Sequence, residues 1–155
     1  MHLVNARSTY LAIKHITPYL RQSDFAKILT ITPPINLDPK WLGAHLPYTS
    51  SKYLLSMHTV GLAEELKLQG LQLNALWPKC RIDSPDICNI ISGTYDNSAN
   101  RKRRPEVMAD AAAVILSSDN QHHGEFFIDE EVLMDAGKDV ECYAVDGEMA
   151  EAFVE

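Results

Sequence analysis

Cysteine and long apolar segments are both scarce in this sequence. The cysteines are Cys80, Cys88 and Cys142, an odd number without the close spacing of a metal site or a disulfide framework. No apolar run approaches the length of a membrane-spanning helix, and the N-terminus lacks the charged-then-apolar pattern of a secretory signal. These absences predict a protein without a membrane span, in a reducing cytoplasm.

Positive charge is nearly absent from the C-terminal end. From Glu125 to Glu155 the chain has eleven acidic residues against Lys138 alone, and its formal net charge is −7. This balance makes nucleic acid an improbable partner and predicts that residues 138–155 form an acidic surface tail. The length of 155 residues and the hydrophobic content of 46% predict a single domain with a packed core.

Glycine-rich turns are also missing. The seven glycines are scattered along the chain, at positions 43, 61, 70, 93, 124, 137 and 147. None of them forms the turn between a strand and a helix that receives a dinucleotide pyrophosphate. A complete dinucleotide site is therefore not contained in these residues.

A tyrosine and a lysine at helical spacing are the chemical feature that is present. If residues from Tyr48 onward are helical, Tyr48 and Lys52 project from one face. A free phenol titrates near pH ~10, and a nearby cation lowers that pKa, so Tyr48 becomes a candidate proton donor and acceptor. With six tyrosines and eight lysines such a spacing also arises by chance, so the surrounding pattern decides its meaning.

Helical and strand patterns alternate around this pair. Apolar residues recur at helical intervals over residues 2–22, with a disturbance expected at Pro18. The near-continuous apolar run at 26–32 predicts a strand buried in a parallel sheet, and a loop at 33–47 leads to a helix at 48–69. The remaining predicted elements are a strand at 71–76, a helix at 105–116, a strand at 125–128 and a helical turn at 132–136. The predicted fold class is α/β.

Five segments in the same order resemble the short-chain dehydrogenase/reductase family, in which Tyr-x-x-x-Lys begins a long helix after a strand and a loop. Four of them, all but Val4–Arg7, together resemble its hydroxysteroid dehydrogenase-like subgroup, which has bacterial members. The segments are Val4–Arg7, Thr32–Leu37, Asn74–Pro78, Pro105–Ala112 and Ile128–Glu130. The resemblance implies a partial Rossmann fold, a doubly wound parallel sheet lacking its N-terminal nucleotide-binding units. Those units are expected to occupy ~100 residues before Met1, so the chain is expected to begin in mid-domain.

The resemblance also implies an activity, the NAD(P)-dependent interconversion of an alcohol and a carbonyl by hydride transfer. Tyr48 would exchange the proton, while Lys52 would depress the pKa of Tyr48 and hold ribose hydroxyls. Asn5 would complete a proton relay through a water molecule. In the subgroup Thr32 takes a place that the family usually gives to serine, so it is a candidate for polarising the substrate carbonyl. A purely structural role at the strand end is equally compatible with the sequence.

Cofactor contacts are implied after the strand at 71–76. Pro78, Ile82 and Ser84 match positions that lie along the nicotinamide in the family, although Lys79 and Cys80 depart from its glycine and threonine. The residue that selects NAD or NADP would lie in the missing units, so the sequence does not choose between these cofactors.

Substrate and partner expectations follow from apolar residues. Trp41, Leu42 and Leu46 either line a pocket for a lipophilic alcohol or carbonyl or cover the core. In the family the helices matching 2–22 and 48–69 form a dimer contact, which implies a homo-oligomer. The polar segment 85–104 resembles a substrate-covering region, and its end, Arg101–Arg104, is expected to be a solvated basic turn.

The incomplete sheet leaves two functions open. A three-stranded sheet would expose the edge of the 27–32 strand and leave helix faces uncovered. The leading expectation is an oxidoreductase whose present residues form an inactive fragment. The alternative is a non-catalytic interaction subunit that dimerises with a complete relative.

Overall fold

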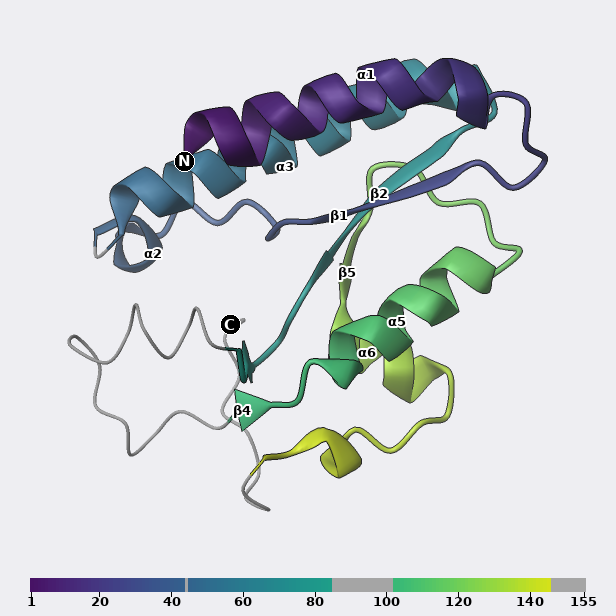
Figure 1. Ribbon diagram of the computed structural model, residues 1–155. Helices are drawn as coiled ribbons and strands as arrows, with labels where there is room; N and C mark the ends of the chain where they lie inside the picture. Colours follow the sequence, from purple (N-terminus) through teal and green to yellow (C-terminus); the bar gives the residue numbers. More distant parts are fainter. Residues whose placement is uncertain (44, 85–101, 146–155) are drawn as a thin grey trace. The chain divides into compact units, whose positions relative to one another are not determined.

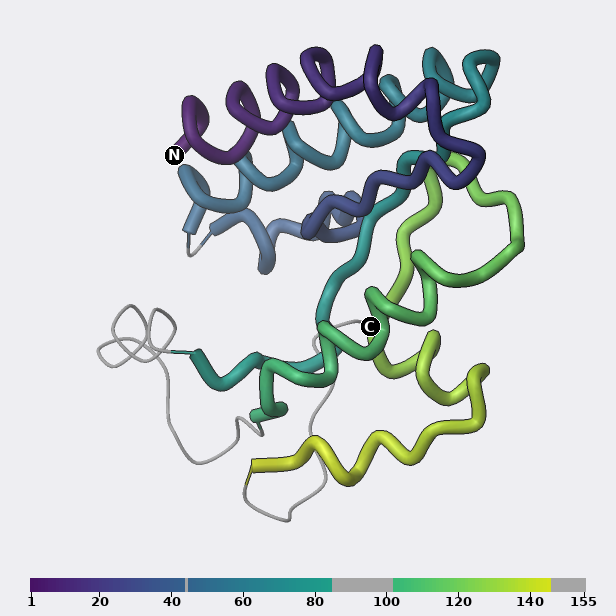
Figure 2. The backbone as a smooth tube through the Cα atoms, turned by 45° about the vertical axis from the view of Figure 1, so that its right-hand side comes forward, coloured from purple at the N-terminus to yellow at the C-terminus, as the bar shows by residue number. Residues whose placement is uncertain are grey.

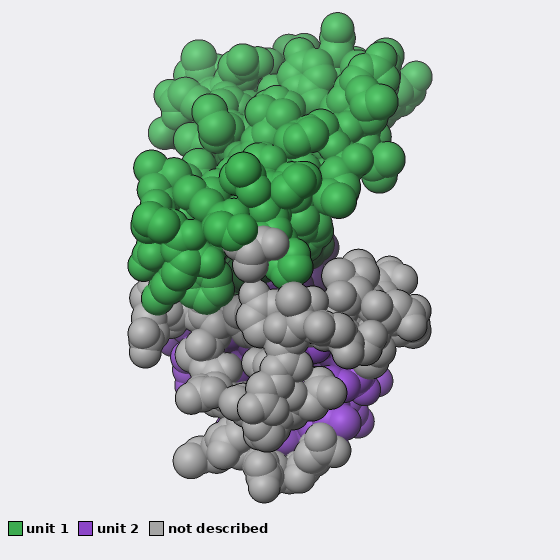
Figure 3. All heavy atoms as spheres, turned by 90° about the vertical axis from the view of Figure 1, so that its left-hand side faces the viewer, with its two compact units in different colours: residues 1–77, 119–127 green, residues 78–118, 128–155 purple. Residues whose placement is uncertain are grey.

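The computed structural model describes residues 1–43, 45–84 and 102–145. The chain divides into two compact units, coloured in Figure 3. The first consists of Met1–Trp77 and Asp119–Phe127, and the second of Pro78–Ser118 and Ile128–Glu155. The units are described separately below.

A three-stranded sheet organises the first unit. Its strands are β1 (Lys27–Ile31), β2 (Gln72–Trp77) and β5 (Phe126–Ile128), in the order β1-β2-β5. The last residue of β5, Ile128, is counted with the second unit. β1 and β2 run parallel, with Lys27 opposite Gln72 and Ile31 opposite Leu76. The predicted α/β class with a parallel, partial Rossmann sheet is confirmed, and β1 lies at one edge of this sheet.

Two long helices lie side by side against these strands (Figures 1 and 2). The chain begins with η1 (Leu3–Arg7), a π-helical turn that continues into α1 (Ser8–Leu20), and the second long helix is α3 (Leu46–Lys67). The first of these helices, α1, continues through Pro18, because a proline so close to its C-terminal end removes one backbone donor without ending the last turn.

The predicted loop at 33–47 contains a short helix, α2 (Pro39–Gly43), which the sequence analysis missed. Its start has a local cause. The Asp38 carboxylate accepts a hydrogen bond from the Lys40 backbone N–H at 2.9 Å, and Pro39 has the backbone angle that a first helical residue needs.

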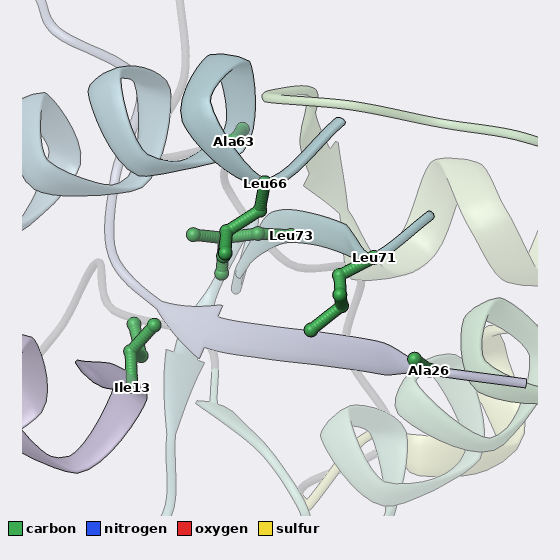
Figure 4. Close-up of a cluster of buried hydrophobic side chains, with 6 residues drawn as sticks. All are labelled: Ile13, Ala26, Ala63, Leu66, Leu71 and Leu73. Carbon is green, nitrogen blue, oxygen red and sulfur yellow. The ribbon is translucent and has the colours of Figure 1, made fainter. Parts of the chain in front are cut away.

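The core of the first unit is shown in Figure 4. It is a cluster of small and branched apolar side chains: Ile13, Ala26, Ala63, Leu66, Leu71 and Leu73. Leu71 and Leu73 are wholly buried, and burying each such side chain stabilises the fold by about 1.5–3 kcal/mol. The cluster joins α1, α3 and the start of β2, and so fixes the helix that carries Tyr48.

Gly124 is required where the chain enters β5. Its φ is +74°, and an added Cβ would stand 3.4 Å from the Cβ of Ala63 on α3. A side chain here would therefore be strained by the backbone conformation, with its Cβ in contact with the helix.

The second unit combines a short strand pair with helices. β3 (Arg81–Ile82) and β4 (Lys102–Arg103) pair in parallel. The helices are α5 (Glu106–Ser117), α6 (Asp129–Asp135) and a 3-10 turn, η2 (Glu141–Tyr143). The sequence analysis predicted α5 closely, placed α6 as a single turn too late in the chain, and missed the strand pair.

Two predicted surface segments in this unit have buried members. Most of residues 138–145 are exposed, but Tyr143 among them is buried and donates a hydrogen bond to the Asp110 carboxylate. Arg103 is not part of a solvated basic turn, since it is only 2% exposed and pairs with Glu130 and Glu141. In both cases the partner lies far away in the sequence, where local charge patterning gives no sign of it.

The remainder of two predicted segments, 85–101 and 146–155, lies outside the described residues. Within the part that is described, no helix combines the length and apolarity needed to cross a membrane.

Candidate active site

Tyr48 and Lys52 occupy the first turns of α3. The helix starts at Leu46, with Pro47 at a position where a missing N–H costs nothing. Helix geometry therefore places Tyr48 and Lys52 one turn apart on the same side. Tyr48 is 45% exposed, so its phenol is accessible.

Lys52 reaches the carboxyl ends of two adjacent strands. Its Nζ donates a hydrogen bond to the carbonyl oxygen of Ile31, at the end of β1, at 2.9 Å. The same atom lies 5.6 Å from the ring centroid of Trp77, at the end of β2, within the range of a cation–π contact. In open α/β sheets, ligands bind beside the carboxyl ends of the strands.

The pKa values of the pair differ from the sequence-based expectation. Burial lowers the pKa of Lys52 and raises the pKa of Tyr48. The predicted depression of the Tyr48 pKa is therefore absent in this arrangement. The cause is burial of the Tyr48 side chain, which disfavours the charged phenolate.

Asn5 is linked to the Tyr48 turn through a buried hydroxyl. The Asn5 Nδ2 donates to the Ser51 Oγ at 3.0 Å, and the Ser51 Oγ donates to the Tyr48 carbonyl oxygen at 2.7 Å. Asn5 lies within the π-helical turn η1. The structure thus brings Asn5, Tyr48 and Lys52 into one region of the first unit.

Thr32 has partners that differ from those of a substrate-polarising group. It is fully buried, and its Oγ1 donates to the Lys52 carbonyl oxygen at 2.9 Å and contacts the Ser56 Oγ at 2.8 Å. Ser56 in turn donates to the Pro33 carbonyl oxygen at 2.7 Å. Of the two roles left open by the sequence, this geometry favours the structural one at the end of β1.

Ser51 and Ser56 are the site residues that sequence analysis missed. Both are fully buried on α3 and bond backbone carbonyls around the proposed catalytic turn. The sequence indicates part of their role, because a serine inside a helix needs a hydrogen-bond partner, and these two lie close to the reactive pair. Which carbonyls they bond depends on the path of β1 and the following loop, which spacing does not reveal.

The predicted substrate-wall residues lie before and at the start of α3. Trp41 is half-buried in α2, and its carbonyl oxygen accepts a hydrogen bond from the Thr49 hydroxyl at 3.1 Å. Leu42 is also half-buried, whereas Leu46 is exposed. Trp41 is therefore tied to the residue that follows Tyr48.

The predicted nicotinamide-side residues Pro78, Ile82 and Ser84 belong to the second unit and are half-buried there. Their segment is held by Asp129, whose Oδ1 accepts the Lys79 backbone N–H at 2.9 Å. Burial and the neighbouring Glu130 raise the pKa of Cys80 to about 11, so its thiol is neutral at physiological pH. The Asp129 contact spans fifty residues and has no local signal in the sequence.

These residues could hold only part of a nicotinamide nucleotide. The ammonium of Lys52 has three donors and uses one on Ile31, which leaves donors for hydroxyl groups near the accessible Tyr48. The sequence has no glycine-rich turn for the pyrophosphate. Among the described residues there is also no cluster of three or more side chains suited to hold a metal ion.

A parallel sheet with helices packed on it, and a Tyr-x-x-x-Lys pair beginning the helix after an edge strand, define a Rossmann-type α/β layer. Hydroxysteroid dehydrogenase-like protein 2 from Xenopus tropicalis is 43% identical over 143 residues, which cover 92% of this chain and 33% of that protein. The resemblance to the short-chain dehydrogenase/reductase family, and to its hydroxysteroid dehydrogenase-like subgroup, is thereby confirmed. The chain spans about a third of the length of the curated relatives it matches.

Solved structures agree with this relationship. A protein from Xanthomonas campestris assigned as a dehydrogenase is 43% identical, with a TM-score of 0.86 over 98% of this chain and 56% of its own. A short-chain dehydrogenase from Mycobacterium thermoresistibile is 32% identical, with a TM-score of 0.81 over 98% of this chain and 55% of its own. No family model matches the sequence.

Proposed function

We propose that this chain carries the proton-transfer part of an NAD(P)-dependent oxidoreductase that interconverts an alcohol and a carbonyl. The observation that carries the proposal is the position of Lys52, which touches the ends of β1 and β2 one helical turn from an accessible tyrosine. The relatives named as dehydrogenases support the same reaction class. The chain alone is inactive in this proposal, because it lacks the pyrophosphate turn.

The proposed chemistry assigns one task to each residue. A bound nicotinamide supplies or accepts the hydride. Tyr48 gives its phenolic proton to the oxygen of the carbonyl as it is reduced, and takes it back when the alcohol is oxidised. Lys52 holds hydroxyl groups with the ammonium donors that its bond to the Ile31 carbonyl leaves over.

Positioning and recognition fall to the neighbouring groups. Asn5 and Ser51 hold the Tyr48 turn, and Asn5 holds a water molecule that relays protons. Pro78, Ile82 and Ser84 form the nicotinamide side of the site, and Trp41 contributes an apolar wall for a lipophilic substrate. NAD and NADP both satisfy this proposal.

Substitution of Tyr48 tests the proposal. A chimaera in which this chain replaces the matched 56% of the Xanthomonas campestris protein is assayed for NADH and NADPH oxidation with a panel of lipophilic ketones and aldehydes. Tyr48→Phe is expected to lower turnover by roughly 10²–10⁴-fold, the usual contribution of a general acid. Near-normal turnover in this variant would refute the role of Tyr48.

Tyr53→Phe is the matched control. Tyr53 lies on the same helix, and its hydroxyl donates to the Asn36 carbonyl oxygen at 2.5 Å. Its loss removes a phenol from α3 without touching the proposed proton donor, so turnover is expected to change by less than about threefold.

A second function is favoured by one observation, the apolar surface of the two long helices. Leu3, Val4, Tyr19, Met57 and Val60 on η1, α1 and α3 are all exposed. A non-catalytic subunit could use this surface to dimerise with itself or with a complete relative. Fluorescence titration with NADH and sedimentation velocity separate the two functions, because the enzyme must hold nucleotide whereas the subunit needs only to associate.

A further inference from the structure

The turn that follows β2 is held by side chains fifty residues further along the chain. Asp129, at the start of α6, accepts the Lys79 backbone N–H through its Oδ1 at 2.9 Å. The same oxygen accepts the Glu130 N–H at 2.8 Å, which fixes the direction of the carboxylate. Asp129 is wholly buried, and hydrogen bonds shielded from water are electrostatically stronger. The backbone of the turn is therefore fixed by a carboxylate that solvent does not reach.

The next carboxylate along the chain holds the second position of the turn. The Oε1 of Glu130 accepts the Cys80 thiol, a weak donor, at 3.6 Å, and it also accepts the Arg103 Nε at 2.9 Å. Cys80 and Glu130 are only 3% and 7% exposed. The Cys80 side chain is thus directed into its own unit, where it anchors the turn.

Arg103 connects this anchor to the other end of the turn. Its guanidinium pairs with Glu130, while its backbone carbonyl accepts the Asp83 N–H at 2.8 Å. The parallel pairing of β3 and β4 sets Ile82 opposite Arg103, and the Lys102 ammonium pairs with the Asp83 carboxylate at 3.2 Å. Both ends of the turn are therefore held by partners within the second unit.

We propose that Asp129 and Glu130 are positioning residues for a nicotinamide ring, because they hold residues 78–82, here called the 78–82 turn, in one shape. This inference rests on the proposed function, which sets a nicotinamide against the turn. Each carboxylate is buried and bonds the turn itself, so it acts through the turn and not by contact with the ring.

Holding the turn in advance has a consequence for affinity. Ordering a backbone segment costs conformational entropy, and a turn that is already held has lost that entropy before a ligand arrives. A nucleotide that lies against the turn therefore binds more tightly when the turn is held. A fragment of the nucleotide that does not reach the turn gains nothing. This difference separates positioning of the nicotinamide from general support of the fold.

The test compares two ligands on the chimaera of this chain with the Xanthomonas campestris protein, by isothermal titration calorimetry. The first is NADH, or NADPH if it binds more tightly, and the second is ADP-ribose, or its 2′-phosphate, which lacks the nicotinamide. Asp129→Ala removes the acceptor of the Lys79 N–H and is expected to weaken binding of the dinucleotide by about tenfold. Binding of the fragment is expected to change by less than about twofold.

Two further variants of α6 are matched controls. Asp129→Asn keeps an oxygen for the Lys79 N–H, and the Asp129 Oδ2 has no hydrogen-bond partner among the described residues, so the new amide nitrogen displaces no bond there. This variant is expected to bind the dinucleotide within about threefold of the unchanged chimaera. Glu131→Gln alters an exposed carboxylate on the same helix and is expected to stay within about twofold.

Amide hydrogen exchange on the 155-residue chain reports on the turn in the absence of nucleotide. Asp129→Ala is expected to speed exchange of the Lys79 amide by about tenfold or more. The Arg104 amide, which bonds the Tyr143 carbonyl at 2.8 Å in the same unit, should exchange as before and so reports that the unit is folded.

A second variant decides the matter if Asp129→Ala frees both amides and the unit has lost its fold. Cys80→Val keeps a buried apolar side chain of similar size and removes the bond to Glu130. It is expected to weaken the dinucleotide by about threefold and to leave the fragment unchanged. Equal binding of the dinucleotide by this variant and the unchanged chimaera would then count against the inference.

Two outcomes would overturn the inference in the folded Asp129→Ala variant. One is equal weakening of the dinucleotide and the fragment, which would make the carboxylates general supports of the fold. The other is unchanged dinucleotide binding after the Lys79 amide has been freed. An unaltered chimaera that binds neither dinucleotide would overturn the proposed function as well. Normal turnover by Tyr48→Phe, with the Asp129 effect on binding intact, would refute the proposed function alone.

Discussion

The two units bury polar groups in opposite ways. Around the Tyr48–Lys52 turn the buried groups are neutral hydroxyls, those of Thr32, Ser51 and Ser56, and each bonds a backbone carbonyl. The second unit instead buries charge. Its Arg103 donates through Nε to Glu130 at 2.9 Å and through a terminal nitrogen to Glu141 at 3.0 Å.

The contrast teaches how each unit should tolerate change. A hydroxyl that bonds a carbonyl contributes modestly, and its loss leaves a neutral acceptor. A buried guanidinium that is removed leaves a buried carboxylate without a counter-charge, which costs much more. The first unit is therefore expected to tolerate polar substitution near its site better than the second tolerates it at Arg103.

The largest expected effect is at Arg103. Burial lowers its pKa, but the hydrogen bonds and charges of Glu141 and Glu130 prevail and raise it, so the side chain stays cationic. Arg103→Met is expected to destabilise the protein by about 3–5 kcal/mol, because Glu130 remains buried and unpaired. Urea unfolding measures the change.

A double substitution sharpens this prediction. If the cost comes from the orphaned carboxylate, Arg103→Met with Glu130→Gln should recover part of the lost stability, since a neutral amide replaces the buried charge. A double variant no more stable than the single one would show that the loss is due to packing instead.

An intermediate effect is expected at Thr32. Thr32→Val keeps the shape of the side chain but removes its bond to the Lys52 carbonyl, which still accepts the Ser56 hydroxyl at 3.1 Å, so the expected cost is about 0.5–1.5 kcal/mol. The same measurement on Thr30→Val provides a matched control in the same strand, since the Thr30 Oγ1 bonds Thr59 and the Asn74 carbonyl, away from Lys52.

The two threonines should differ in what they do to the site. Both variants are expected to lose stability, but only Thr32→Val should change the titration of Lys52, followed by NMR of its ¹⁵Nζ. Identical Lys52 titrations in the two variants would contradict a role for Thr32 in holding the Lys52 turn.

The smallest expected effect concerns the pH dependence that Tyr143 and Asp110 give the second unit. The hydrogen bond from Tyr143 lowers the pKa of Asp110, so its contribution to stability is present above the unfolded pKa of ~3.9 and is lost as the pH falls through the lower folded value. The Asp110 bond raises the pKa of Tyr143 to about 12, so that contribution is complete below pH ~10 and is lost as the pH rises towards about 12.

Tyr143→Phe removes the alkaline contribution and the larger part of the acid one, since Lys138 still lies 3.6 Å from the Asp110 carboxylate. The denaturant midpoint of this variant, compared with that of the unchanged protein between acid and alkaline pH, is expected to show a flatter decline below pH ~4 and above pH ~10. Parallel pH profiles for the two proteins would show that the pair does not affect stability.

Local sequence predicted the elements of the first unit well. The strand expected at 26–32 is β1, the helix expected at 48–69 is α3, and the strand expected at 71–76 is β2, each within about two residues. These elements bury apolar side chains at regular intervals, so the pattern is visible in a short window. The Tyr48–Lys52 spacing likewise needs only one helical turn.

Features made by distant pairs could not be predicted in the same way. Arg103 pairs with Glu130 and Glu141, which lie 27 and 38 positions further along the chain, and Asp129 holds the backbone at Lys79. In the sequence each of these side chains alone resembles an ordinary surface charge. The predicted direction of the Tyr48 pKa shift was wrong for a related reason. It depends on how far the folded chain buries the Tyr48 side chain, which residue spacing does not reveal.

The chain passes between its two units three times, after Trp77, Ser118 and Phe127. On the ribosome, the first unit cannot complete its sheet until β5 emerges, by which time α5 of the second unit has already been made. The edge of β2 that pairs with β5 therefore stays unpaired while the residues between these two strands are synthesised. Neither unit can be cut out as one continuous stretch, and during translation each must wait for the other.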